Sequence, residues 1–148
     1  MSRHRRKSGA VERYVALYHW IMDKPAWREL DCVSRAAYLE LGRRYAGPGS
    51  NNGRIPYSVR EMAEALRVSK ATAQRAFQRL IEHGFIARMK KGAFSLKVRH
   101  ASEWRLTEHK CDVTQELATK DFARWQKQKP VRPENPTGYQ NDTERAAS

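Results

Sequence analysis

Two short helices joined by a very tight turn are the feature that most constrains this chain. The stretch EALRVSKATAQRAFQRL, Glu64–Leu80, has apolar residues at three- and four-residue spacing on both sides of the turn RVS. Ser58 opens the first helix and stands three residues before Glu61, which is the spacing of a capping box. Ser69 is placed to cap the second helix. The pattern predicts a helix-turn-helix.

A tight crossing of these two helices requires small residues where they meet. Ala63 fills this place on the first helix, and Ala73 and Ala76 face inward on the second, which spans Lys70 to about His83. Arg67 stands in the turn, where such motifs usually have glycine. If the backbone there needs a positive φ, arginine costs about 1 kcal/mol relative to glycine. We expect the packing of the helix pair to tolerate that cost.

The flanking sequence completes an α+β layout. A helix is expected over 31–46, opened by Asp31, with a core stripe of Val33, Ala36, Ala37, Leu41 and Tyr45. A turn at 47–53 and a strand of at most three residues at 54–56 follow it. After the two motif helices, which Gly84 ends, two antiparallel strands are expected at about 85–90 and 103–108. The predicted fold is therefore mainly α with a small antiparallel β-hairpin, a winged helix-turn-helix. Candidate anchors of its core are Trp27, Trp104, Trp125, Phe77, Phe85 and Phe94.

The ends of the chain differ in composition from its middle. Residues 1–9 predict a disordered basic arm, and residues 126–148, polar and with three prolines, predict a disordered tail. Between them, residues 10–125 form the predicted domain, which includes an N-terminal cover segment with helical turns near 19–22 and 25–30. Thr119 is placed to open a short helix that ends near Trp125.

Charge is the strongest global signal. Lysine and arginine total 29 and the acidic residues total 16, for a net charge of +13. Residues 67–100 contain nine basic residues and a single acidic one, Glu82. Such a local excess favours a polyanionic partner, either nucleic acid or an anionic membrane surface.

The second motif helix has an outward face made for hydrogen bonding. Lys70, Ala71, Thr72, Gln74, Arg75 and Gln78 point away from its apolar side, and arginine, lysine and glutamine are the side chains that read base edges in the major groove. The residues predicted to contact DNA are Arg67, Ser69, Lys70, Thr72, Gln74, Arg75, Gln78, Arg79, Lys90, Lys91, Lys97 and Arg99. Among them the four after residue 88 belong to the basic loop and are expected to contribute mainly phosphate attraction.

Residues 55–86, IPYSVREMAEALRVSKATAQRAFQRLIEHGFI, resemble the N-terminal DNA-binding domain of GntR-type regulators and also small winged-helix proteins that accompany bacterial phage and plasmid functions. The resemblance implies DNA contact from the start of the second helix, by Ser69, Lys70, Thr72 and Gln74, with the basic wing on the adjacent backbone. Gln74 stands where the GntR pattern often has arginine, so base preference does not carry over. About forty residues follow residue 108, too few for the effector domain of such a regulator.

The expected function is sequence-specific binding of double-stranded DNA by a transcriptional regulator without an effector domain. The alternatives are a replication-initiation or accessory protein of a plasmid or phage, and a winged helix used for RNA or protein interaction. Whether the chain acts as a homodimer stays open. No dimerisation helix stands out.

The residues give little support to an enzyme, a metal-binding protein or a membrane protein. His109 and Cys111 are too few to hold zinc, and Cys32 is expected to be a small core residue. We therefore expect no catalytic residue, no metal and no cofactor. No stretch approaches about 18 consecutive apolar residues and no signal peptide is visible, so we expect no membrane partner and a cytoplasmic, nucleoid-associated protein.

Overall fold

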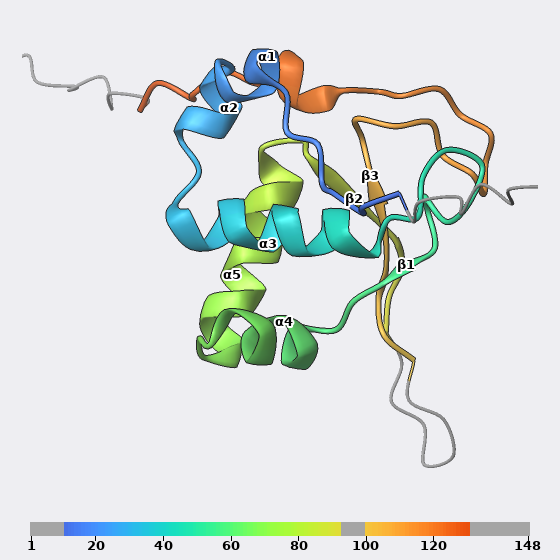
Figure 1. Ribbon diagram of the computed structural model, residues 1–148. Coiled ribbons are helices and arrows are strands. Elements are labelled where there is room, and N and C mark those ends of the chain that lie inside the picture. Colours follow the sequence, from blue (N-terminus) through green and yellow to red (C-terminus); the bar gives the residue numbers. More distant parts are fainter. Residues whose placement is uncertain (1–10, 93–99, 131–148) are drawn as a thin grey trace, which may run out of the picture.

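Three mutually packed helices stand beside a small antiparallel sheet (Figure 1). The computed structural model describes residues 11–92 and 100–130. In chain order its elements are α1 (His19–Met22), α2 (Pro25–Arg28), α3 (Cys32–Arg44), β1 (Ile55–Pro56), α4 (Val59–Leu66), α5 (Lys70–Glu82), β2 (Ile86–Lys90), β3 (Glu103–Leu106) and the 3-10 turn η1 (Asp121–Ala123). The α+β class predicted from the sequence is confirmed.

Short polar residues start the three longer helices, as predicted. The Asp31 carboxylate accepts a hydrogen bond from the Ser34 N–H at 2.7 Å and opens α3. Ser58 and Glu61 form both bonds of a capping box at the start of α4. Because each bond satisfies a backbone or side-chain group that would otherwise lack a partner, these starts are fixed locally by the sequence.

A glycine ends α5. Gly84 has a φ of 80°, a conformation that side-chain-bearing residues rarely adopt. Its N–H donates to the Ile81 carbonyl at 3.0 Å, and the N–H of Phe85 reaches back to the Leu80 carbonyl at 2.9 Å. These two bonds are a Schellman motif, and they turn the chain directly into β2.

The sheet has the order β1-β3-β2, and both of its pairings are antiparallel. Ile86 is opposite Leu106 in the β2–β3 pair, and Ile55 is opposite Trp104 on the other side of β3. The register of β2 against β3 shifts between Arg88 and Lys90. Both predicted hairpin strands are therefore present, and the short segment before α4 adds a third strand to them.

Aromatic rings fill the core between α3, α5 and the sheet. The Phe77 ring stacks on Trp104 with the ring centres 4.6 Å apart, and Phe85 stacks on Phe122 at 4.8 Å. Trp27 meets Phe85 edge-on at 5.7 Å. Of the six predicted anchors, Trp27, Trp104, Phe77 and Phe85 are buried, Trp125 is half-buried and Phe94 lies outside the described residues.

The core face of α3 differs from the prediction. Ala37 and Leu41 are fully buried as expected, but Ser34 and Tyr38 complete the buried stripe, while Val33, Ala36 and Tyr45 are only half-buried. Cys32 is exposed, so its assignment as a core residue is wrong. It occupies the first position of the helix, which turns away from the core.

The chain after β3 folds back over the far end of α5, and residues 107–125 are called the C-terminal strap here. The helix expected from Thr119 to Trp125 is wrong in extent, because Lys120 has a φ of 47° and interrupts it, leaving only η1. Phe122 in η1 is fully buried, and its N–H donates to the Gly84 carbonyl at 3.2 Å. The strap thus closes the end of α5.

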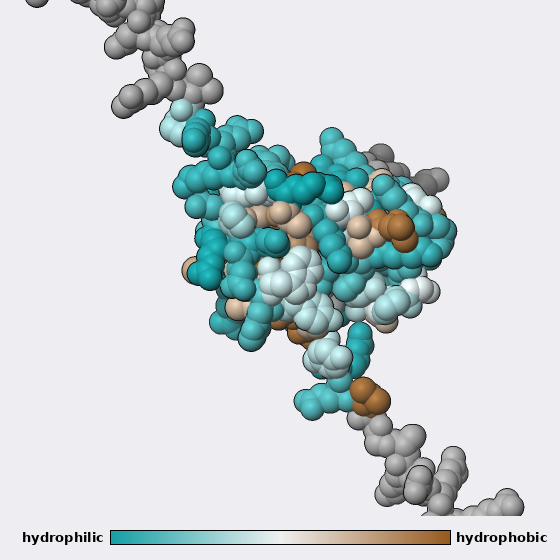
Figure 2. Space-filling model, turned by 90° about the horizontal axis from the view of Figure 1, so that it is seen from above, coloured by the Kyte–Doolittle hydropathy of each residue, from teal (hydrophilic) through white to brown (hydrophobic). Residues whose placement is uncertain are grey.

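The N-terminal cover segment lies over the strap. Residues 11–18 have no regular structure, and α1 and α2 follow at the two predicted places. The Trp20 ring lies 5.6 Å from that of Phe122. Figure 2 shows the molecule from above, where hydrophilic side chains cover most of the surface and apolar ones form small separate spots.

The predicted arm, and the predicted tail beyond residue 130, lie outside the described residues. Residues 126–130 are described and have no regular secondary structure. Within the described ranges, every helix is too short or too polar to cross a bilayer.

Candidate nucleic-acid interface

The turn between α4 and α5 is built on Arg67. Its φ of 54° and ψ of 45° place it in the left-handed region, where an arginine in the glycine position of the motif is strained. The N–H of Arg67 donates to the Glu64 carbonyl at 3.4 Å and that of Val68 to the Ala63 carbonyl at 3.0 Å. These two bonds are a Schellman motif. They orient Arg67 outward, and its side chain is exposed.

A chain of side-chain hydrogen bonds occupies the first turn of α5. The Ser69 hydroxyl accepts from the Thr72 N–H at 3.1 Å and lies 2.9 Å from the Thr72 hydroxyl. Arg75 donates to the same Thr72 hydroxyl at 3.3 Å. Ser69 and Thr72, both predicted to contact DNA, are therefore engaged in starting the helix and in holding Arg75.

The outer face of α5 is polar and open. Lys70, Ala71, Gln74, Arg75 and Gln78 are all exposed, as the sequence pattern predicted. The opposite face buries Ala73, Ala76, Phe77 and Leu80. The small side chains of the buried face let α5 lie close to its neighbours, and its polar face stays available to a partner.

The far end of that face carries an acid. Glu82 is exposed, and its carboxylate accepts a hydrogen bond from the Gln78 amide at 3.0 Å. A carboxylate at this point repels phosphate, so the cationic part of the face is confined to the first turns of α5.

Arg79 is engaged within the protein. Its Nε lies 3.3 Å from Oδ2 of Asp31, the residue that caps α3. Burial opposes ionisation of Asp31, but the hydrogen bonds from Ser34 and the charge of Arg79 outweigh it and lower the pKa of the Asp31 carboxyl. Both side chains are about half exposed, so water screens the pair and Arg79 can exchange this partner for another anion.

The hairpin supplies a second set of cations. Lys90 and Lys91 are exposed at the end of β2, whereas Lys97 and Arg99 lie outside the described residues. Arg88 lies over the Trp104 ring, with its guanidinium carbon 5.0 Å from the ring centre. The described ends of the hairpin and the α4–α5 turn reach the same, lower end of the molecule (Figure 1).

Sequence reasoning missed two features of this surface. The ion pair of Arg79 with Asp31 joins residues far apart in the chain, and no local pattern signals it. Arg88 lies opposite Trp104, a place that follows only once the strand register is known.

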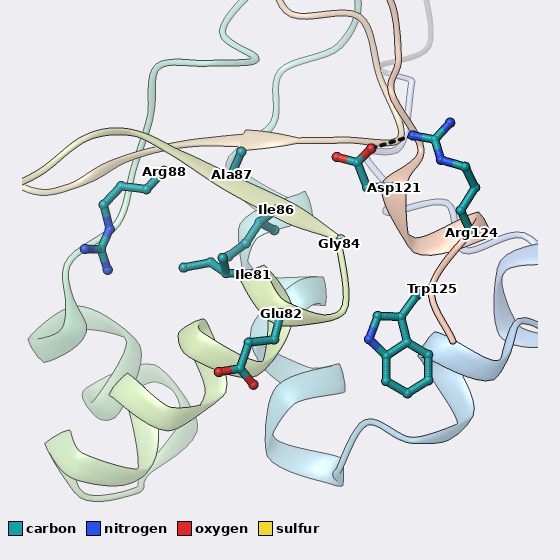
Figure 3. Close-up of a pocket in the computed structure, with 9 residues that line it drawn as sticks. All are labelled: Ile81, Glu82, Gly84, Ile86, Ala87, Arg88, Asp121, Arg124 and Trp125. Carbon is teal, nitrogen blue, oxygen red and sulfur yellow. Dashed lines mark hydrogen bonds and ion pairs between the residues drawn. The ribbon is translucent and has the colours of Figure 1, made fainter. Parts of the chain in front are cut away.

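A groove opens where α5, β2 and the strap meet (Figure 3). Ile81 and Ile86 supply its apolar part. Asp121 and Arg124 form an ion pair at 2.8 Å on the strap side, while Glu82 and Arg88 line the other side. Opposite charges are mixed around the groove, so it lacks the single sign that a phosphate site needs.

Comparison of the chain with protein-family models, with curated proteins and with solved structures found no match. Across residues 11–92 and 100–130, no three His, Cys, Asp or Glu side chains gather to hold a metal ion.

Proposed function

We propose that this chain is a winged helix-turn-helix protein that binds double-stranded DNA sequence-specifically, as a transcriptional regulator. In this proposal α4 and α5 are the helix-turn-helix, α5 is the recognition helix, and the β2–β3 hairpin is the wing.

The observation that carries the proposal is the position of two cationic elements. The outer face of α5 presents Lys70 and Arg75, and Lys90 and Lys91 are exposed at the end of β2. The α4–α5 turn, where α5 begins, and the described end of the hairpin lie at the same end of the molecule (Figure 1). A duplex presents phosphates on both sides of its major groove, so a helix in the groove with cations beside it matches that charge pattern.

The chemistry of the α5 face also favours duplex DNA over a protein partner. Apart from Ala71 and the terminal Glu82, its exposed side chains are cationic or amide-bearing, while Phe77 and Leu80 are buried. A protein-binding face commonly has an apolar centre, which this face lacks. RNA duplexes have a deep, narrow major groove that side chains cannot read, which makes B-form DNA the better fit.

A gel-shift experiment on the full chain tests the class of ligand. Labelled duplex DNA, single-stranded DNA and a structured RNA are titrated at several salt concentrations. We expect the duplex to bind most tightly, with an affinity that falls steeply with salt. Tighter binding of the RNA or the single strand, or no binding to nucleic acid, would refute the proposal.

Two variants separate base reading from phosphate attraction. Gln74→Ala removes an exposed amide from the α5 face and should change sequence preference, with about 1–3 kcal/mol lost on the preferred site. Lys90→Ala should weaken binding to all duplexes alike and reduce the salt slope by about one. Equal losses on all sequences for both variants would contradict this division of roles.

Selection of bound sequences from a random duplex pool then gives the target. A palindromic consensus would indicate a homodimer on two half-sites, because the symmetry of an operator mirrors that of the protein. A single asymmetric site would indicate a monomer.

A further inference from the structure

The outer face of α5 is not uniformly basic, and its charges are arranged in a pattern. Ala71, Gln74 and Gln78 stand at positions i, i+3 and i+7, so they form one line along the helix, and all three are exposed. Lys70 flanks this line on one side and Arg75 on the other. An uncharged strip therefore runs between two cations.

This pattern matches the cross-section of a major groove. Bases lie at the floor of the groove, where hydrogen bonds and methyl contacts carry sequence information, and phosphates line its edges. From Ala71 to Gln78 the helix rises roughly 10 Å, at 1.5 Å per residue, which is the length of about three base steps. The strip faces the bases when the two cations face the phosphates.

The residues of the strip differ in whether their side chains already make a hydrogen bond. The Gln78 amide already donates to Glu82 at 3.0 Å, which places a carboxylate beside it. Gln74 makes no side-chain hydrogen bond within residues 11–92 and 100–130, so both its amide groups are open to a base in the described structure. Ala71 offers only a methyl group. The base contacts therefore concentrate on Ala71 and Gln74.

We propose, resting on the DNA-binding function above, that Ala71 contacts the C5-methyl group of a thymine and that Gln74 reads the adenine of a neighbouring base pair. Glutamine pairs with adenine N6 and N7 through two hydrogen bonds, and alanine contacts the thymine methyl. The two residues are about 4.5 Å apart along the helix, close to one base step. The target therefore contains two adjacent A·T pairs at the place where α5 enters the groove.

The test is a double-mutant cycle, in which one change is made in the protein and one in the DNA, on the sequence selected from a random pool. Each thymine in turn is replaced by deoxyuridine, which lacks only the methyl group, and binding is measured for the wild type and for Ala71→Gly. At one position we expect the wild type to lose about four-fold in affinity, the value of one buried methyl group at 0.8 kcal/mol, and the variant to lose nothing there. Because the variant is compared with itself on two DNAs, any loss of helix stability cancels.

A second cycle tests Gln74. Replacement of the adenine of the neighbouring pair by 7-deazaadenine removes the N7 acceptor, and it should weaken the wild type but leave Gln74→Ala unchanged. The inference alone is overturned if the protein binds duplex DNA but no uracil substitution matters, if the uracil loss is equal in both proteins, or if the selected site has G·C pairs at this place. Absence of duplex binding overturns the proposed function together with this inference.

Discussion

Replacement of Arg67 by glycine separates backbone strain from charge at the α4–α5 turn. Arg67 has a φ of 54° and a ψ of 45°, and a left-handed L-residue costs about 1–2 kcal/mol. Glycine removes that strain but gains freedom in the unfolded chain, which offsets about 0.5–1 kcal/mol. The net gain for Arg67→Gly is therefore about 0–1.5 kcal/mol, with a central value of about 0.75 kcal/mol. At about 2–4 °C per kcal/mol for a chain of this size, that central value raises Tm by about 1.5–3 °C.

The matched control is Arg67→Ala. Alanine also lacks the charge but keeps the Cβ atom, so the strain remains and Tm should not rise. Thermal unfolding followed by circular dichroism on the three proteins gives the comparison. A glycine variant no more stable than the alanine variant would refute the strain argument.

The same two variants test the contact with DNA. The exposed guanidinium of Arg67 lies in the turn that precedes α5, where we propose that it faces a phosphate. Loss of one phosphate contact should lower the slope of log K against log salt by about 0.9, equally in both variants. A wild-type slope in both variants would leave Arg67 with no role in DNA binding.

Four further predictions concern other parts of the fold. Lys91→Ala should weaken all duplexes alike, with a shallower salt dependence measured by fluorescence anisotropy. Asp31→Asn keeps an N-cap but frees Arg79, so non-specific affinity for DNA should rise in the same assay. A Cβ on Gly84 would lie 2.7 Å from the Phe122 nitrogen, so Gly84→Ala should cost more than about 1 kcal/mol in urea unfolding. Burial opposes ionisation of Glu61, but hydrogen bonds from Ser58 and Arg44 outweigh it and lower the pKa of this carboxyl. The ionised Glu61 therefore contributes fully to the free energy of unfolding above a pH of about 4.3, and this contribution is lost as pH falls through the folded-state pKa. Glu61→Gln should make the fall of Tm on the acid side less steep.

The parts of the fold that the sequence predicts well are those with local causes. Ser58 caps α4 through Glu61, three residues away, and Ser69 caps α5 through Thr72 at the same spacing. Gly84 ends α5 with two hydrogen bonds that lie within residues 80–85. Such signals are legible because both partners lie in one short stretch of sequence.

The features that escaped prediction depend on distant partners or on a single backbone angle. Lys120 adopts a left-handed conformation, which a lysine in the sequence does not predict, and this reduces the expected helix to η1. Arg79 is predicted from the sequence to contact DNA, but Asp31, which caps another helix, lies 3.3 Å from it. The exposure of base-reading candidates such as Gln74 is predictable from helical periodicity, whereas their engagement with neighbours is not.

The closure of α5 by the C-terminal strap has a consequence for synthesis of the protein. Gly84 and Phe122 are 38 positions apart, and the ring of Phe122 covers Phe85. At roughly 5–20 residues per second, a ribosome needs about 2–8 s to make the intervening segment. During that interval α5 is complete in sequence, while Phe85 has its earlier neighbours Trp27 and Tyr38 but lacks the ring of Phe122. We therefore expect a nascent chain stopped in this interval to be more prone to aggregation than the finished chain, because one face of Phe85 is open.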